Sequence, residues 1–335
     1  MSIHHEGLRT NAASITNLRD VLKARGHLRG YIRHTPLEHS YELSRHAGAD
    51  VYLKLENLQV TGSFKVRGPL NRLLSLTNEE RERGVVGATA GNHGIGLSYA
   101  AKQLGMRAHI YLPETADPAK VRVLESHDAV LHLLPDIEEA RQAAMRAAQR
   151  DGMVFVSAYS DPFVIAGNGT IGLEIVDDLP DVEVAVVPVG GGGLVSGIGT
   201  ALKAVNPALE VWGVEAANSP TFTTWRLRGE TAPVKLLPSI AEGLSGYIEP
   251  ETITWPIVSD VVDKMLGVSE VEITRAMAWT MEHHRYVVEP SGAAAMAVLL
   301  RAPAELRGRR VTVVLSGRNV SMPRFMSLMG YQKGR

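Results

Sequence analysis

The chain has 335 residues, with 35 Lys plus Arg, 36 Asp plus Glu and no cysteine. The net charge of −1 argues against nucleic acid or an anionic membrane surface as the main partner, because both are bound through an excess of positive charge. Without cysteine the chain can form no disulfide, no thiolate nucleophile and no thiolate metal site.

No stretch of 18 or more uninterrupted apolar residues is present, so the sequence predicts no transmembrane helix. Residues 1–10 contain charges and a His pair but lack the apolar run of a secretory signal. We therefore expect a cytoplasmic protein.

Short apolar runs alternate with longer helical patterns along the chain. Such alternation is typical of βαβ units and a mostly parallel sheet. Several runs are apolar throughout, as expected for strands that are buried on both faces. The predicted strands are 51–55, 85–88, 108–112, 129–133, 153–157, 184–189, 211–214 and 311–315, and the predicted helices are 16–25, 94–105, 137–150, 163–178, 194–205, 271–284 and 292–300.

Lys65 follows a Thr-Gly-Ser-Phe turn at the start of a predicted helix, whose first turn holds Pro69. An amine near a helix N-terminus and away from bulk water has a lowered pKa. Such an amine can form a Schiff base. A solvated surface lysine is the alternative that the residues alone leave open.

Four consecutive glycines join the apolar run at 184–189 to the helical pattern at 194–205. Bare backbone N–H groups can fold around an anion because no Cβ blocks them. The helix that follows adds free N–H groups and the positive end of its dipole. The cluster therefore predicts a phosphate site that uses neither lysine nor arginine.

One literal G-x-G-x-x-G is present, at Gly167, Gly169 and Gly172. A dinucleotide site requires this motif on the turn directly after a strand. Here it lies inside a helical pattern, so we interpret these glycines as positions of close helix packing.

Taken together, these segments resemble the motifs of the fold-type II pyridoxal-phosphate enzymes, in the serine/threonine dehydratase and serine racemase branch. The resemblance runs from about residue 35 to about residue 319, with the motifs in family order. It implies an α/β fold like that of the tryptophan synthase β-subunit, with parallel-rich sheets flanked by helices. We expect a large domain from residues 1–74 and 151–335, a small domain from 75–150, and the cofactor between them.

The resemblance also implies roles for individual residues around pyridoxal phosphate. Lys65 matches the lysine that carries the cofactor and then acts as the catalytic base. The other cofactor contacts implied are Phe64 and Gly243 on the two faces of the ring, Asn92 on its phenolic oxygen, Ser316 on its pyridine nitrogen, and Gly190, Gly191, Gly192 and Gly193 on the phosphate.

Residues 89–94 resemble the loop that receives the substrate carboxylate. The predicted substrate contacts are Thr89, Ala90, Gly91 and His93. Ala90 replaces a serine that serves in the racemase branch as a base on the opposite face of the substrate. Alanine cannot transfer a proton, which favours elimination over racemisation.

Residues 215–221 resemble the cation site of the family, with Glu215 and Ser219 as weak candidate ligands. Thr221 stands where the family has an aspartate. A hard divalent cation needs about six oxygen ligands, mostly anionic. We therefore predict no bound metal.

These observations predict a pyridoxal-phosphate ammonia-lyase that converts a β-hydroxy-α-amino acid, such as L-serine or L-threonine, to a 2-oxo acid and ammonia by α,β-elimination. The alternatives of the same fold are an amino-acid racemase, a β-replacement synthase and a dehydratase of a bulkier 3-hydroxy-amino acid. The alternative of another class is a phosphate-binding protein without enzymatic activity. We expect a homodimer with a small-molecule amino-acid substrate.

Overall fold

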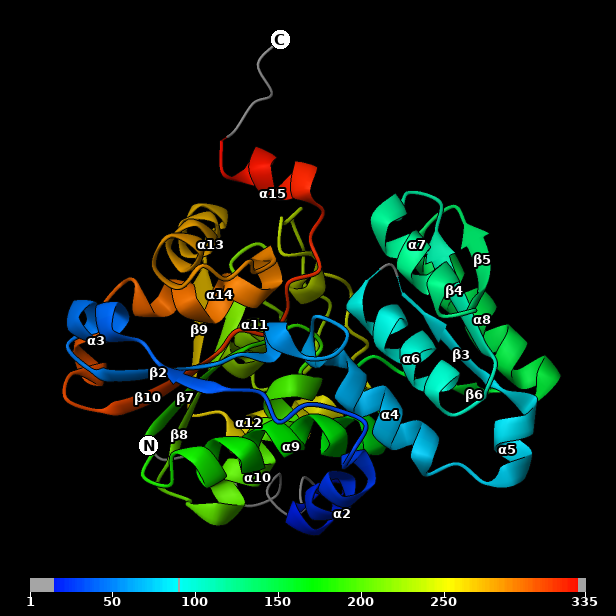
Figure 1. Cartoon of the computed structure of the whole chain (residues 1–335), viewed down its shortest axis with the longest axis horizontal. Coiled ribbons are helices and arrows are strands. Elements are labelled where there is room, and N and C mark those ends of the chain that lie inside the picture. Colours follow the sequence, from blue (N-terminus) through cyan, green and yellow to red (C-terminus); the bar gives the residue numbers. More distant parts are fainter. Residues whose placement is uncertain (1–14, 90, 331–335) are drawn as a thin grey trace.

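Two sheets of mainly parallel strands form the framework of the fold (Figure 1). The computed structural model describes residues 15–89 and 91–330. The larger sheet has the strand order β1-β2-β10-β7-β8-β9, and the smaller has the order β5-β4-β3-β6. In this part of the chain, β1 alone runs antiparallel to its neighbour.

The strands of the larger sheet come from both ends of the sequence, whereas those of the smaller sheet are consecutive. The larger sheet comprises β1 (Leu37–His39), β2 (Asp50–Lys54), β7 (Val184–Pro188), β8 (Glu210–Ala216), β9 (Lys264–Val268) and β10 (Arg310–Val314). The smaller sheet comprises β3 (Val85–Ala88), β4 (Ala108–Pro113), β5 (Val130–Leu134) and β6 (Val154–Phe155).

Helices connect most of the strands and cover the sheets. They are α2 (Leu18–Leu28), α3 (Tyr41–Ala47), α4 (Arg67–Leu74), α5 (Asn78–Arg83), α6 (Asn92–Gln103), α7 (Pro118–Ser126), α8 (Ile137–Asp151), α9 (Pro162–Asp178), α10 (Gly193–Val205), α11 (Thr221–Arg228), α12 (Thr254–Val261), α13 (Glu270–His284), α14 (Pro290–Leu299) and α15 (Met322–Leu328). None of them combines the length and apolarity that a bilayer span requires, within the residues described.

The central strand β7 is buried at every position because the larger sheet has a core on each face. Val184 and Val186 belong to the core that contains α13 and α14. Ala185 and Val187 belong to the core that contains α9 and α10. This arrangement explains why the run at 184–189 is apolar throughout rather than alternating.

The G-x-G-x-x-G segment lies inside α9, as the sequence predicts. A Cβ at Gly169 would lie 2.9 Å from the carbonyl oxygen of Gly197, and one at Gly172 would lie 2.9 Å from that of Ile198. Both oxygens belong to α10. The glycines therefore let two helices approach closely, and the interpretation as packing positions is confirmed.

Each strand and helix predicted from the sequence coincides with an element of the structure. The prediction missed β1 and β9, which form the two edges of the larger sheet. β1 has only three residues and β9 contains a lysine and a glycine, so neither carries the apolar run of a central strand. The domain boundaries at residues 75 and 150 stay a prediction.

The parallel strands place their carboxyl ends, where ligands bind in such sheets, close to the predicted motifs. The glycine cluster begins two residues after β7, and Ser316 lies two residues after β10. Thr89 directly follows β3 of the smaller sheet.

Candidate active site

A cavity of about 730 Å³ collects the site residues that the sequence predicts. Its wall includes Phe64, Lys65, Thr89, Gly91, Asn92, His93, Gly190, Gly191, Gly192, Gly193, Gly243 and Ser316. Ala90 lies outside the described residues.

Lys65 lies in a short 3₁₀ turn, Phe64–Val66, directly before α4. Its Nζ donates a hydrogen bond to the carbonyl oxygen of Ala158, at 2.9 Å. Loss of solvent around this amine lowers the pKa of Lys65 to about 8, against the opposing influence of the Glu289 carboxylate. At pH 7 about a tenth of this amine is therefore uncharged, and the uncharged form is the one that nucleophilic attack and proton abstraction require.

The turn that carries Lys65 is fixed to the end of the larger sheet. The backbone N–H of Phe64 donates to the carbonyl oxygen of Ser316, at 3.1 Å, and Ser63 forms a β-bridge with Gly317. The Nζ of Lys65 lies 5.1 Å from the centre of the Phe64 ring. Two segments far apart in the sequence thus meet beside the lysine.

The glycine cluster ends in the first turn of α10, where backbone N–H groups have no partner in a preceding turn. Gly192 has φ +84°, which favours glycine. A Cβ at Gly190 would lie 2.7 Å from the carbonyl oxygen of Gly243, and one at Gly193 would lie 2.9 Å from the Cα of Tyr159. The loop therefore needs bare backbone, and it offers the cavity the donors that a phosphate group requires.

Asn92 belongs to a chain of hydrogen bonds that holds its amide in one orientation. Its Nδ2 donates to Oε1 of Glu289 at 2.5 Å, and its Oδ1 accepts from Nδ2 of Asn319 at 2.7 Å. Burial raises the pKa of Glu289 to about 7, although Lys120 opposes this shift. Sequence analysis assigned no role to Glu289, and the structure makes it the partner of a predicted cofactor contact.

His93 is held in one neutral form. Its Nε2 donates to the carbonyl oxygen of Val156 at 2.9 Å, and burial lowers its pKa to about 3. Its Nδ1 has no hydrogen-bond partner among the described residues. His93 therefore lines the cavity as a neutral acceptor and carries no positive charge near neutral pH.

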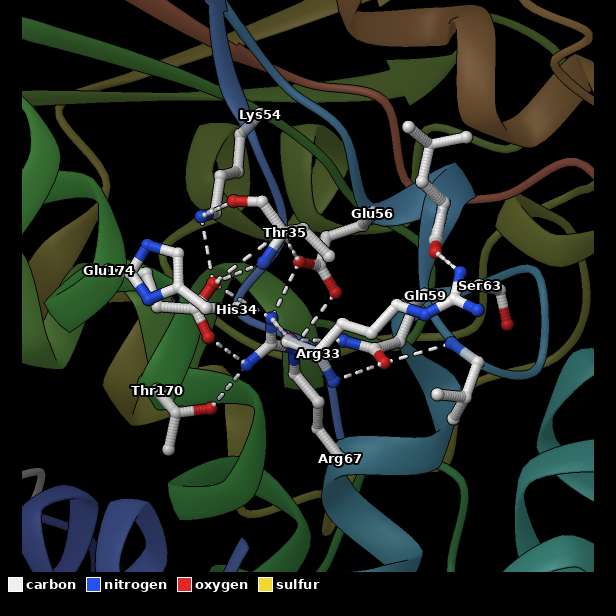
Figure 2. Close-up of polar contacts among 12 residues, drawn as sticks. Arg33, His34, Thr35, Lys54, Glu56, Gln59, Ser63, Arg67, Thr170 and Glu174 are labelled. Carbon is white, nitrogen blue, oxygen red and sulfur yellow. Dashed lines mark hydrogen bonds and ion pairs between the residues drawn. The ribbon is translucent and has the colours of Figure 1, made fainter. Parts of the chain in front are cut away.

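A buried network of charged side chains surrounds Arg67, the first residue of α4, which follows the lysine turn (Figure 2). The guanidinium of Arg67 donates to both oxygens of Glu56 and to both oxygens of Glu174, at 2.6 to 3.0 Å. Lys54 contacts the same Glu174, at 2.7 Å, and donates to the carbonyl oxygen of Thr35, at 2.6 Å. The network joins β2, α4 and α9, and so fixes the start of α4 two residues after Lys65.

The sequence motifs did not predict this network of buried ion pairs. The sequence carries one indication of this network. Two charged residues, Lys54 and Glu56, alternate with apolar residues where the predicted strand at 51–55 ends. Both side chains are fully buried, and buried charges are found almost only when they are paired. Lys54 pairs with Glu174 on α9, more than 100 residues away in the sequence, and Glu56 pairs with Arg67 at the start of α4.

The wall of the cavity also carries further charged residues. Arg141 pairs with Glu138 through two hydrogen bonds of 2.9 and 3.1 Å. The hydroxyl of Tyr159 donates to Glu249, and burial together with this carboxylate raises the pKa of Tyr159. The remaining charged residues of the wall are Asp117, Lys120, Glu242 and Arg324.

The weak metal candidates lie apart from the cavity wall. The carboxylate of Glu215 accepts hydrogen bonds from the backbone N–H groups of Phe222 and Thr223 and from the hydroxyl of Thr223, at 2.6 to 3.0 Å. These donors belong to the first turn of α11, so Glu215 acts as a helix cap. Ser219 uses its backbone N–H to close a turn onto Ala216.

Comparisons with known proteins find a matching family and similar enzymes. Residues 28–317 match the family described as "Pyridoxal-phosphate dependent enzyme". The chain is 42% identical over 306 residues to an L-threonine ammonia-lyase of Thermotoga maritima, covering 91% of this chain and 76% of the relative. It is 39% identical over 317 residues to a catabolic L-threonine dehydratase of Staphylococcus aureus, covering 93% of this chain and 91% of the relative.

Solved structures of a racemase and of a deaminase are also similar to this chain. A maize serine racemase superposes with a TM-score of 0.89 at 28% identity, covering 94% of this chain and 97% of that one. The processed form of a threonine deaminase from Solanum lycopersicum superposes with a TM-score of 0.86 at 28% identity, covering 98% and 94%.

Proposed function

Because the chain belongs to the family of pyridoxal-phosphate dependent enzymes, we propose that it is an ammonia-lyase for a β-hydroxy-α-amino acid. The reaction removes the α-proton and the β-hydroxyl, and hydrolysis of the product then gives a 2-oxo acid and ammonia. The names of the relatives, an L-threonine ammonia-lyase and an L-threonine dehydratase, support this substrate class.

One observation supports the proposal most directly. The amine of Lys65, whose pKa is lowered, and the glycine loop at residues 190–193 line the same cavity. Lys65 has a pKa of about 8 and lies where the glycine loop, Asn92 and Ser316 converge. A phosphate-binding protein without catalysis would need the glycine loop but no lysine of this kind.

The residues present fit the cofactor. The glycine loop would hold its phosphate, Asn92 its phenolic oxygen and Ser316 its pyridine nitrogen. Phe64 and Gly243 would lie against the ring. When bound, pyridoxal phosphate supplies an electron sink for the substrate α-carbon.

The chain itself supplies the proton transfer and the positioning. The Nζ of Lys65 takes the α-proton, because it is tethered beside the site and is partly uncharged at neutral pH. The network around Asn92 fixes its amide before the substrate arrives, so no reorganisation is needed at the moment of reaction. Thr89, Gly91 and His93 line the part of the cavity assigned to the substrate.

The proposal is tested with purified holoenzyme and a panel of 3-hydroxy-amino acids that includes L-serine and L-threonine. We expect equal amounts of ammonia and 2-oxo acid from at least one member. Ammonia release from none of them, or formation of a β-substituted amino acid with an added nucleophile, would contradict an ammonia-lyase.

A racemase is the second candidate, because serine racemases are among the similar structures. The sequence favours elimination, since alanine at position 90 cannot donate a proton to the opposite face of the substrate. We expect no D-serine after partial turnover of L-serine, measured by chiral chromatography, and a measurable amount from Ala90→Ser. Substantial D-serine from the wild type would favour the racemase.

A cytoplasmic location and a homodimer belong to the same proposal. Light scattering coupled to size-exclusion chromatography tests the dimer, for which a mass of twice 36.3 kDa is expected. Fractionation of the producing cells tests the location.

A further inference from the structure

Lys120 reaches the cavity from α7, on the side of the smaller sheet. Its side chain is only 18% exposed. A Cβ built on Gly91 would lie 3.9 Å from its Nζ. The ammonium therefore lies beside the backbone of Gly91, the residue directly before α6.

The acidic partner of Lys120 holds it weakly. Nζ lies 3.5 Å from Oε2 of Glu242, whereas a charge-assisted hydrogen bond is normally about 2.7–2.9 Å long. The other oxygen of Glu242 accepts from Nη2 of Arg324 at 3.0 Å, and the Glu242 side chain is 59% exposed. Glu242 thus keeps a cationic partner when Lys120 leaves it.

Three other cations on the cavity wall have roles or partners of their own, and Arg324 is the one that pairs with Glu242, at 3.0 Å. Lys65 is the residue that carries the cofactor, and Arg141 is paired with Glu138 through two hydrogen bonds. Lys120, in contrast, is mostly buried and makes only a long contact to Glu242. It also lies close to Gly91, in the loop predicted to receive the substrate carboxylate.

We propose that Lys120 is a substrate-binding residue whose ammonium takes the α-carboxylate of the amino acid in exchange for Glu242. This inference rests on the proposed function, because it requires an amino-acid substrate at the loop of residues 89–94. The loop and the start of α6 supply neutral N–H donors, and Lys120 supplies the full positive charge that a carboxylate needs when it leaves water.

The test compares L-alanine, which has an α-carboxylate but no β-hydroxyl to lose, with L-alaninamide, which has no carboxylate. Binding to the holoenzyme is followed by the change in visible absorbance of the cofactor. The variants are Lys120→Gln, Lys120→Arg and Glu242→Gln. Lys102→Gln is the matched control, because Lys102 lies on α6 and pairs with Asp128 at the surface.

We expect Lys120→Gln to weaken the binding of L-alanine about 10- to 100-fold, the value of a hydrogen bond to a charged group, and to leave L-alaninamide unchanged. Lys120→Arg should retain most of the affinity, and Lys102→Gln should retain all of it. Glu242→Gln should strengthen the binding of L-alanine alone, because it removes the competing carboxylate. This last variant tests the exchange even if Lys120→Gln fails to fold.

An equal loss for both ligands in Lys120→Gln, or unchanged binding of L-alanine in either Lys120→Gln or Glu242→Gln, would overturn the inference. Its failure differs from a failure of the proposed function. If the wild type binds L-alanine and releases ammonia from a hydroxy-amino acid but Lys120→Gln matches it, only the role of Lys120 is wrong. If the wild type binds no amino acid, both are wrong.

Discussion

Arg67 and Glu56 form a buried bidentate ion pair, with Nε to Oε2 and Nη2 to Oε1 both 2.8 Å apart. Both side chains are fully buried, and Arg67 lies two residues after the lysine that faces the cavity. Replacing one partner leaves the other charge buried without compensation, which costs about 3–5 kcal/mol.

Arg67→Met should therefore lower the free energy of unfolding by about 3–5 kcal/mol, measured by urea denaturation. Arg67→Lys should also destabilise the protein, because a single ammonium cannot reproduce two bidentate contacts. Arg45→Met is the control, since Arg45 is 82% exposed and pairs only with Glu42. A loss in Arg67→Met no larger than in Arg45→Met would mean that the network contributes little to stability.

Lys65→Ala should abolish both turnover and the visible absorbance of bound cofactor while the fold stays intact. The loss of a positioned general base alone lowers a rate about 10²- to 10⁴-fold, and here the cofactor anchor is lost as well. Activity assays, absorbance spectra and circular dichroism measure the three effects. Lys235→Ala, at an exposed loop position, should behave like the wild type. Near-native activity in Lys65→Ala would refute the mechanism.

Glu289 should make the stability of the apo-protein depend on pH. Its pKa rises from 4.5 to about 7 on folding, so between these values the folded chain binds a proton that the unfolded chain does not. This contribution is complete below about pH 4.5 and is lost as the pH rises through about 7. Relative to Glu289→Gln, the wild type should be about 2 kcal/mol more stable at pH 5.5 than at pH 8.

Urea denaturation of both apo-proteins at the two pH values measures this difference. Glu289→Gln is a suitable reference because it keeps the size and a hydrogen-bonding group toward Asn92 but cannot titrate. A stability difference that does not change with pH would show that Glu289 titrates in the folded protein as it does in the unfolded chain.

Gly190→Ala should weaken the affinity of the apo-protein for pyridoxal phosphate at least about tenfold, because its Cβ would lie 2.7 Å from the carbonyl oxygen of Gly243. Gly26→Ala is the matched control. Gly26 lies in α2 with no atom within 4 Å of a built Cβ, so alanine there should leave the affinity unchanged and stabilise the helix by about 1 kcal/mol. Titration of the visible absorbance measures both affinities, and equal values would argue against the glycine loop as the phosphate site.

Removal of divalent cations with EDTA should leave both activity and the melting temperature unchanged, because the oxygens of Glu215 already accept hydrogen bonds from α11. Glu215→Ala should cost about 1–2 kcal/mol of stability through the loss of this cap. A loss of activity in EDTA that Mg²⁺ reverses would show instead that a cation is required.

Local sequence patterns predict most of the framework and the cofactor side of the site. The runs at 184–189 and 311–315 are apolar because their strands are buried on both faces, and the glycine loop and Lys65 are recognisable from a few neighbouring residues. The edge strands β1 and β9 lack such a pattern, and pairing with a neighbour rather than local preference makes them strands.

The charged parts of the site could not be predicted in the same way. Arg67 meets Glu174, and Lys120 meets Glu242, only because the fold brings distant segments together. A lysine or glutamate considered without its partners is expected at the protein surface. Its burial depends on charged partners that no local sequence pattern identifies. Glu289 likewise has no role assigned from the sequence, and only its contact with Asn92 links this carboxyl group to the site.

The position of β10 between β2 and β7 has a consequence for biosynthesis. The strand order places one of the last strands to be translated at the centre of the larger sheet, directly beside one of the first. Lys65 leaves the ribosome early, yet Ser316, which holds its turn in place, follows only after β10. The nascent chain therefore carries its reactive lysine until the segment around Ser316 has been synthesised, and only then can the pocket that controls that lysine close around it.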